Sequence, residues 1–283
     1  MQDDRVQAEA MPWANLRLPP FPQVAVRILQ LARNENVQLH QLCDLVSSDP
    51  AFASELLTVA NSVLYAPRYP SASIVQAVAV LGANTLQGMC VAVGVRAYLG
   101  KTMSYPAMRA LWRHSLASAL VAQRLARVCL IDKDTAFTAG ILHDVGRMGL
   151  AVIQPAPYAA LLDRHRGAAP TLLDAERALF GWDHCQTGRR LVEGWNLPEE
   201  IQSAVFQHHQ PPSPDGVCNL LELVKVSCEL ASALGFAAFS GCETPPPDGL
   251  LARLPSSAHS LVPNGLAAFA KDLADSIHAI EAI

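Results

Sequence analysis

The sequence predicts an all-α protein, and three observations support this. Apolar residues recur at a helical period along nearly the whole chain, as at Val24, Ile28 and Leu31. Runs that alternate β-branched and polar residues, which would indicate strands, are scarce. Prolines and glycines separate the periodic segments without forming a repeat. One helix is expected to begin at Pro50. The other expected helices cover residues 22–33, 37–47, 73–81, 83–98, 107–129, 132–147, 155–165, 171–179, 184–195, 198–209, 217–234 and 264–283.

Several of these helices carry start and stop signals. Asp49 is placed to cap the helix whose first turn holds Pro50, where proline fits because no backbone N–H is needed. Gly82 marks the end of one helix and the start of the next. Asp183 either caps the helix that begins at His184 or orients a neighbouring imidazole, and capping is favoured.

Length and composition allow one large or two small domains with a sizeable core, because 51% of the 283 residues are hydrophobic and 16% are charged. Soft boundaries fall at residues 100–106 and 240–249. The last helix either packs back or mediates association. The expected parts are a flexible N-terminal tail at 1–15, a helical half at 16–106, a histidine-containing half at 107–240, and a proline-containing linker with a C-terminal helix at 241–283.

Charge and cysteine usage exclude some classes of protein. The net charge of −4 comes with no basic stripe, which disfavours direct binding of nucleic acid. The seven cysteines have no CxxC pair and no disulfide-like spacing, which suits a reducing cytosol. The N-terminus lacks an apolar core, and no segment reaches the roughly 18 uncharged apolar residues of a membrane span. A cytoplasmic protein without a membrane span is expected.

Four histidines lie on apolar helical faces, because residues three, four, seven and eleven apart share a face. His114, for example, shares its stripe with Ala117 and Val121. His165 lies between two arginines and is instead expected to be solvated. The four inward histidines are His114, His143, His184 and His208.

A single inward histidine is more often a hydrogen-bonded core residue than a ligand. Four together favour a shared ion, because each buried unpaired imidazole costs free energy. His209 and Asp144 add two further donors to the set. Histidine and aspartate ligands suit iron, zinc, manganese or nickel better than calcium.

The order of these residues resembles the HD phosphohydrolase superfamily, whose all-α fold holds one or two metals that activate water for attack on a phosphoester. The segments "LPPFPQVAVRILQLARN", "LVSSDPAFASELLTVANSVLY", "AFTAGILHDVGRMGLAV" and "ERALFGWDHCQTGRRLVEGWNLPEEIQSAVFQHHQPP" further resemble the HDOD family, bacterial signalling relatives of the HD and HD-GYP enzymes. The resemblance covers about residues 16–235 and implies an HDOD domain at 16–240, with an HD-like helical bundle at 107–240.

The chain departs from the HD pattern at several positions. Cys228 stands where HD enzymes have their last metal-binding aspartate, and it is either a thiolate ligand or, as favoured, a small buried hydrophobe. Ala110 replaces a glutamate that relatives with a larger metal cluster carry, and "QPPSPDGVCN" replaces the DGxGYP loop of the cyclic-dinucleotide branch. Arg147 is either a positive group near the pocket or a solvated arginine at a helix end.

The resemblance therefore implies a signal-transduction domain that acts through protein–protein interaction, with signalling proteins as partners and a homo-oligomer left open. The alternative is a metal-dependent phosphohydrolase acting on a nucleotide or phosphoester, with Asp144 and Arg147 as its catalytic residues. Enzymatic activity stays open, with a non-enzymatic role favoured. The expected ligands of a divalent metal (Fe, Mn, Zn or Ni) are His114, His143, Asp144, His184, His208 and His209.

Overall fold

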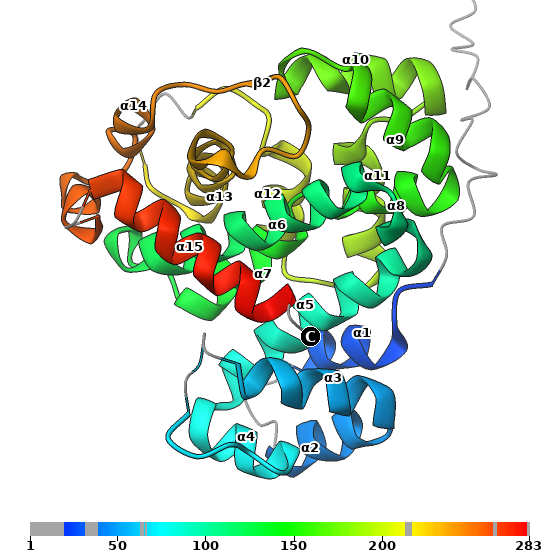
Figure 1. Cartoon of the computed structure of the whole chain (residues 1–283), viewed down its shortest axis with the longest axis vertical. Helices are drawn as coiled ribbons and strands as arrows, with labels where there is room; N and C mark the ends of the chain where they lie inside the picture. Colours follow the sequence, from blue (N-terminus) through cyan, green and yellow to red (C-terminus); the bar gives the residue numbers. More distant parts are fainter. Residues whose placement is uncertain are drawn as a thin grey trace, which may run out of the picture.

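The computed structural model confirms the all-α prediction (Figure 1). It describes residues 20–31, 39–62, 65, 67–212, 217–262 and 265–281. The expected tail at 1–15 lies outside these residues, as do the last residues of the first expected helix and the first of the second.

The N-terminal half is a layer of five helices, drawn in blue to cyan in Figure 1. The side chain of Asp49 accepts hydrogen bonds from the amides of Ala51 and Phe52, so the predicted cap is confirmed. Gly82 has a φ of 86°, which glycine adopts easily, and it separates two helices as predicted. The helices are α1 (Gln23–Leu31), α2 (Leu39–Ser47), α3 (Pro50–Ala60), α4 (Ile74–Leu81) and α5 (Ala83–Leu99).

The second half surrounds one long central helix, α6, which packs most extensively against α7 and α13. Its elements are η2 (Gly100–Ser104), α6 (Pro106–Leu125), η3 (Ala126–Cys129), α7 (Lys133–Leu142), α8 (Val145–Ile153), α9 (Pro155–Arg164), β1 (Gly167–Ala168), α10 (Ala169–Phe180), α11 (His184–Gly194), α12 (Glu199–Gln207), α13 (Leu220–Ala231) and the π-helical turn η4 (Ser232–Phe236).

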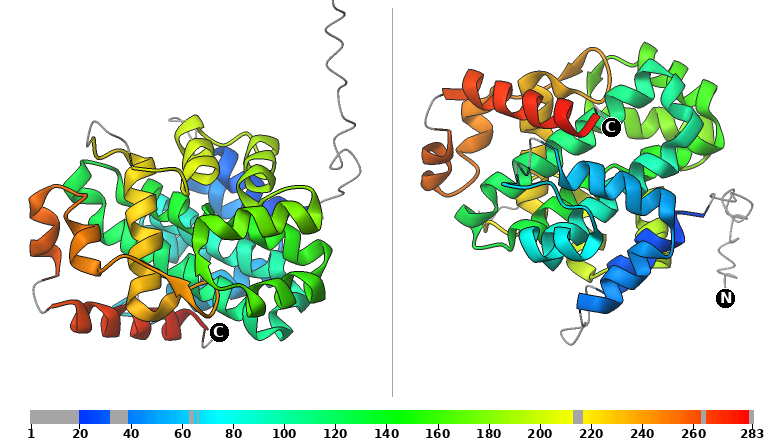
Figure 2. Two further views of the ribbon diagram at one scale, coloured as in Figure 1. Left: turned by 90° about the horizontal axis from the view of Figure 1, so that it is seen from above. Right: turned by 60° about the horizontal axis from the view of Figure 1, so that its bottom comes forward.

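The C-terminal segment folds back onto this half. Its elements are β2 (Cys242–Glu243), α14 (Pro247–Leu251), η5 (Ser256–Leu261) and α15 (Gly265–Glu281). Figure 2 shows α15 along one flank of the molecule, where it contacts α6. It buries Phe269, Leu273 and Ile277 there. The last helix therefore packs back onto the second half, which is one of the two roles expected for it.

The expected helix over 132–147 is wrong, because the chain turns within it. α7 ends at Leu142 and α8 begins at Val145, with Asp144 outside helical geometry at φ −100° and ψ 16°. The turn lets α8 pack against α11 at Gly146, where a Cβ would overlap the His184 carbonyl. Helical periodicity continued through the break, and only this packing reveals it.

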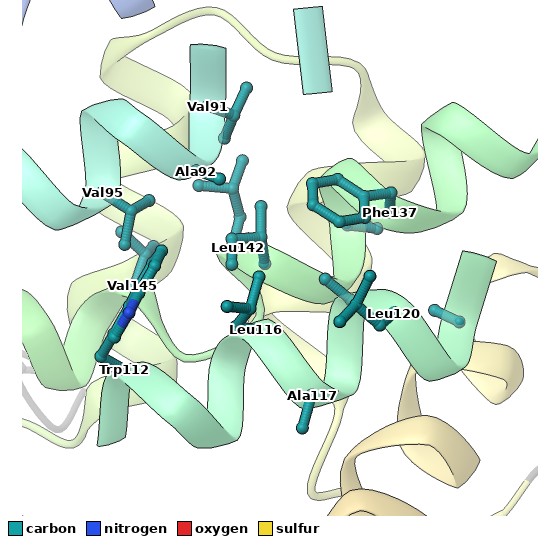
Figure 3. Packing of buried hydrophobic residues seen from close by; sticks show 14 of the residues in the cluster. Val91, Ala92, Val95, Trp112, Leu116, Ala117, Leu120, Phe137, Leu142 and Val145 are labelled. Carbon is teal, nitrogen blue, oxygen red and sulfur yellow. The ribbon is translucent and has the colours of Figure 1, made fainter. Parts of the chain in front are cut away.

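The two halves share one apolar core (Figure 3). Helix α5 of the first half packs against α7 and α8 of the second. The side chains that meet there include Val91, Ala92, Val95, Trp112, Leu116, Leu142 and Val145, all of them buried. This continuous core fixes the helices that carry the polar residues described below.

One stretch of the described residues, Lys133–Ile153, is long and apolar enough to cross a membrane by length and composition. Its most apolar window is 83% buried inside the fold, and it is broken between α7 and α8. It forms part of the protein core.

The structure pairs Cys129 with Cys218 in a disulfide, with Cα atoms 5.3 Å apart and a sequence separation of 89. The spacing of the cysteines in the sequence therefore did not predict this disulfide. Packing of η3 beside the start of α13 brings the two cysteines together, and sequence spacing carries no information about such a contact.

Candidate metal centre

The structure brings together every residue that the sequence predicted as a ligand. Apart from His209, which is half-buried, each of them is almost fully buried. With Cys228 they come from five segments: His114 from α6, His143 and Asp144 from the turn between α7 and α8, His184 from the start of α11, His208 and His209 from the end of α12, and Cys228 from α13.

Four of the imidazole rings are fixed in orientation by a hydrogen bond at Nδ1. Their acceptors are the carbonyls of Phe236 for His114 (2.8 Å), Gly140 for His143 (2.7 Å) and Val205 for His208 (2.9 Å), and Glu176 Oε2 for His184 (2.6 Å). Since these oxygens only accept, each Nδ1 carries a hydrogen, and Nε2 points into the pocket. Metal-binding histidines in proteins are usually fixed in this way.

The Nε2 atoms meet in two pairs. His114 and His143 are 3.3 Å apart at Nε2, and His184 and His208 are 3.4 Å apart. Burial lowers the pKa of His143 to about 3 and lowers that of His114 as well. The first pair is therefore neutral near pH 7, and two nitrogen lone pairs face each other.

Asp144 lies between the two pairs and divides the pocket. Its Oδ1 is 3.4 Å from Nε2 of both His184 and His208, and its Oδ2 is 3.6 Å from His143 Nε2 and 3.7 Å from His114 Nε2. Burial opposes ionisation of Asp144, but Arg147 and then His143 outweigh burial and hold its pKa well below the usual value. The carboxylate Oδ2 is buried and has no hydrogen-bond partner.

Arg147 reaches into the pocket from α8. Its side chain is 1% exposed, so the interpretation as a solvated arginine at a helix end is wrong. Its Nε donates to Asp144 Oδ1 at 2.8 Å, and its Nη2 lies 3.3 Å from His209 Nε2. A cation is thus built into one side of the site.

Glu176 is a functional residue that the sequence did not single out for this role. It is fully buried, and it accepts hydrogen bonds from the His184 ring, the His184 amide and the Tyr158 hydroxyl. Burial and Arg147 oppose protonation of His184, but Glu176 and Cys185 favour it, and the pKa of His184 is raised to about 10. The predicted capping by Asp183 is confirmed, since its Oδ1 accepts from the Gln186 amide at 2.8 Å.

Cys228 also reaches the site, because its Sγ lies 3.5 Å from His114 Nε2. Burial and then Asp144 raise the pKa of this thiol well above its usual value. The donor atoms form two groups, each within 4.8 Å: Asp144, His184, His208 and His209 in one, and His114, His143 and Cys228 in the other. Both groups fit a divalent metal by residue type.

Residues 236–243, which we call the strap, lie over the pocket after η4. The Phe236 carbonyl holds His114, and the Phe239 ring lies 6.0 Å from the Arg147 guanidinium carbon. β2 pairs in parallel with β1 beyond the pocket. Phe239 also packs 5.2 Å from the ring of His165, which is half-buried under it and not fully solvated as expected.

An all-α domain with paired histidines around a central aspartate is typical of HD-type proteins. The profile of the HDOD domain matches residues 18–211, and the chain belongs to this family.

Relatives agree with this assignment. An HDOD domain protein of unknown function from Geobacter sulfurreducens is 22% identical, with a TM-score of 0.72 over 94% of this chain and 93% of that one. A protein from Shewanella amazonensis SB2B, provisionally named a phosphohydrolase, is 20% identical, with a TM-score of 0.66 over 96% and 97% of the two chains. At these identities the likeness shows the fold alone.

An uncharacterized protein from Treponema pallidum (strain Nichols) is 27% identical over 217 residues. The match covers 74% of this chain and 41% of that protein. The chain thus corresponds to about two fifths of the length of this curated relative.

Proposed function

We propose that this chain is a regulatory HDOD domain that holds a divalent metal, relays a signal to a protein partner, and does not turn over phosphoesters. The fold and the buried histidine–aspartate pocket support a metal site. A metal bound there would supply Lewis acidity in a hydrolase, or a cross-link between helices in a regulatory domain.

One observation carries the non-enzymatic part of the proposal: Arg147 donates to Asp144 Oδ1 from inside the pocket. A hydrolytic centre keeps a coordination position open to water and substrate. Here the guanidinium fills space beside the carboxylate, and the strap covers it with the Phe239 ring. These residues orient the carboxylate and exclude water from it.

Exposed apolar side chains indicate where a protein partner would bind. Leu39, Tyr69, Val75 and Val80 are between 54% and 72% exposed, and all four belong to the N-terminal half around α2 and α4. Helices α2 and α4 pack against each other, so Leu39, Val75 and Val80 lie on neighbouring elements, which favours a protein contact there. We therefore assign the relay surface to α4, on the half of the molecule that lacks the pocket.

The second candidate is a metal-dependent phosphohydrolase, and the complete set of five histidines with Asp144 favours it. Metal analysis followed by phosphatase and phosphodiesterase assays with added manganese, iron or zinc separates the two candidates. We expect bound metal and no turnover. Turnover that His143→Ala and Asp144→Ala both abolish would overturn the regulatory proposal.

The relay surface has its own test. In the native host, a tagged Val75→Glu/Val80→Glu variant should lose a protein that co-purifies with the wild type. Val217→Glu changes a side chain that is 53% exposed outside the N-terminal half, and it should retain that protein. Thermal unfolding and metal content should match the wild type in both variants. If both variants retained the co-purifying protein equally well, the assignment of the relay surface to α4 would be wrong.

A further inference from the structure

We propose that the pocket takes a single thiophilic ion of the zinc class, bound by His114, His143, Cys228 and Asp144 Oδ2, while Arg147 replaces a second metal on the Oδ1 side. This inference rests on the proposed metal binding and deepens it. It assigns a ligand role to Cys228.

The distances from His114 to His143 and to Cys228 match those of a tetrahedral zinc site. With Zn–N of about 2.0 Å and Zn–S of about 2.3 Å, two nitrogens lie about 3.3 Å apart, and a nitrogen lies about 3.5 Å from a sulfur. His114 Nε2 is 3.3 Å from His143 Nε2 and 3.5 Å from Cys228 Sγ. Asp144 Oδ2 lies slightly farther away, 3.6 and 3.7 Å from the two nitrogens, and would move closer to them as the fourth ligand.

The same donors include a polar atom without a hydrogen-bond partner. Asp144 Oδ2 is a buried carboxylate oxygen without a hydrogen-bond partner, which is costly in a core. The lone pairs of His114 and His143 face each other, because each Nδ1 donates to a backbone carbonyl. One ion at the centre of the group would satisfy the oxygen and both nitrogens.

The other side of Asp144 differs because it already holds a cation. Arg147 donates to Oδ1 at 2.8 Å and also reaches His209, one of the donors on that side. A second divalent ion next to Oδ1 would meet this buried guanidinium, and two adjacent cations repel. The arrangement therefore favours one metal per chain.

Cys228 sets the class of metal. A thiolate is a soft ligand that suits zinc, cobalt or iron, whereas carboxylates suit magnesium and manganese. Binding would replace the thiol proton with a sulfur–metal bond and release that proton to solvent. The position at which HD relatives use an aspartate thus becomes the position that selects the ion.

Cobalt(II) provides a direct test on the full-length protein after removal of metal with a chelator. We expect one cobalt per chain, with intense visible d–d bands and a near-ultraviolet thiolate-to-cobalt charge-transfer band. Zinc should displace the cobalt and abolish the band.

Two cysteine variants make the assignment specific. Cys228→Ser should abolish the charge-transfer band and weaken zinc binding at least about tenfold, since even loss of an outer partner costs about 10- to 100-fold. Cys242→Ser removes a half-buried free thiol of the strap and should retain both. The wild-type spectrum decides the question alone if Cys228→Ser does not fold.

The outcomes separate this inference from the proposed function. One cobalt per chain without a thiolate band would overturn the role of Cys228 and leave metal binding intact. Two ions per chain would overturn the role of Arg147. Failure to bind cobalt, zinc, manganese or iron would overturn both the inference and the proposed metal binding.

Discussion

The two halves of the molecule use the same kind of helix but have different cores. Among the described residues before Gly100, Ser71 is the only buried polar or charged side chain. The second half buries four histidines, Asp144, Arg147 and Glu176. The core of the first half is almost entirely apolar, whereas the core of the second half also holds charged and polar groups whose burial is costly without partners. The contrast predicts that the second half is the more sensitive to small changes.

The largest expected effect is that of Gly146→Ala, at the contact between α8 and α11. A Cβ there would overlap the His184 carbonyl backbone, so we expect a loss of more than about 4 kcal/mol in the free energy of unfolding, or failure to fold. Gly194→Ala, on α11 with nothing within 4 Å, is the matched control and should change it by less than about 1 kcal/mol. Denaturant unfolding measures both, and equal losses would disprove the close contact.

Cys129→Ser tests the covalent link within the second half. The disulfide closes a loop of 89 residues, and its loss should destabilise the protein by about 2 to 4 kcal/mol. Without reductant, the unfolded wild type should expose five free thiols out of seven cysteines. Seven titratable thiols, together with unfolding unchanged by the mutation, would show that the link does not form.

Acid should loosen the second half of the metal-free protein selectively. Burial lowers the pKa values of His114, His143, His208 and His209, so the unfolded chain binds more protons below pH 6.5. Each histidine held neutral then costs up to about 1.4 kcal/mol per pH unit below that pH. Amide hydrogen exchange at pH 7 and 5.5 should show faster opening of α6, α7 and α12 than of α3 and α5. Equal increases in the exchange rates of both halves would contradict a selective effect of acid on the second half.

Glu176→Gln should have the smallest effect, about 1 kcal/mol, because the amide oxygen still accepts from His184 while the charge is lost. The pKa of His184 is raised to about 10, and Glu176 contributes most to raising it, so this stabilisation is present below pH 6.5 and is lost as the pH rises through about 10. In the variant we expect the His184 pKa, followed by NMR, to fall by at least one unit. An unchanged pKa would show that another group holds the proton.

Much of the candidate site could be predicted from the sequence. Helical spacing identified His114, His143, His184 and His208 as inward, and their neighbours His209 and Asp144 completed the expected ligand set, which the family resemblance supported. The role of Glu176 could not be predicted, and the sequence left Arg147 open between a positive group near the pocket and a solvated arginine, because each role depends on which residues of other helices lie opposite. An acidic residue eight positions before His184 gives no periodic signal, although it holds that ring at 2.6 Å.

The sequence by itself determined the helices, the inward faces and the family, because periodic burial and capping are local properties of the chain. Only the tertiary structure decided the break before Val145, the disulfide between Cys129 and Cys218, and the division of the pocket by Asp144. The physical reason is that periodicity reports which face of a helix is buried. Which buried groups meet there depends on how the helices pack, at contacts as close as that of Gly146 with His184.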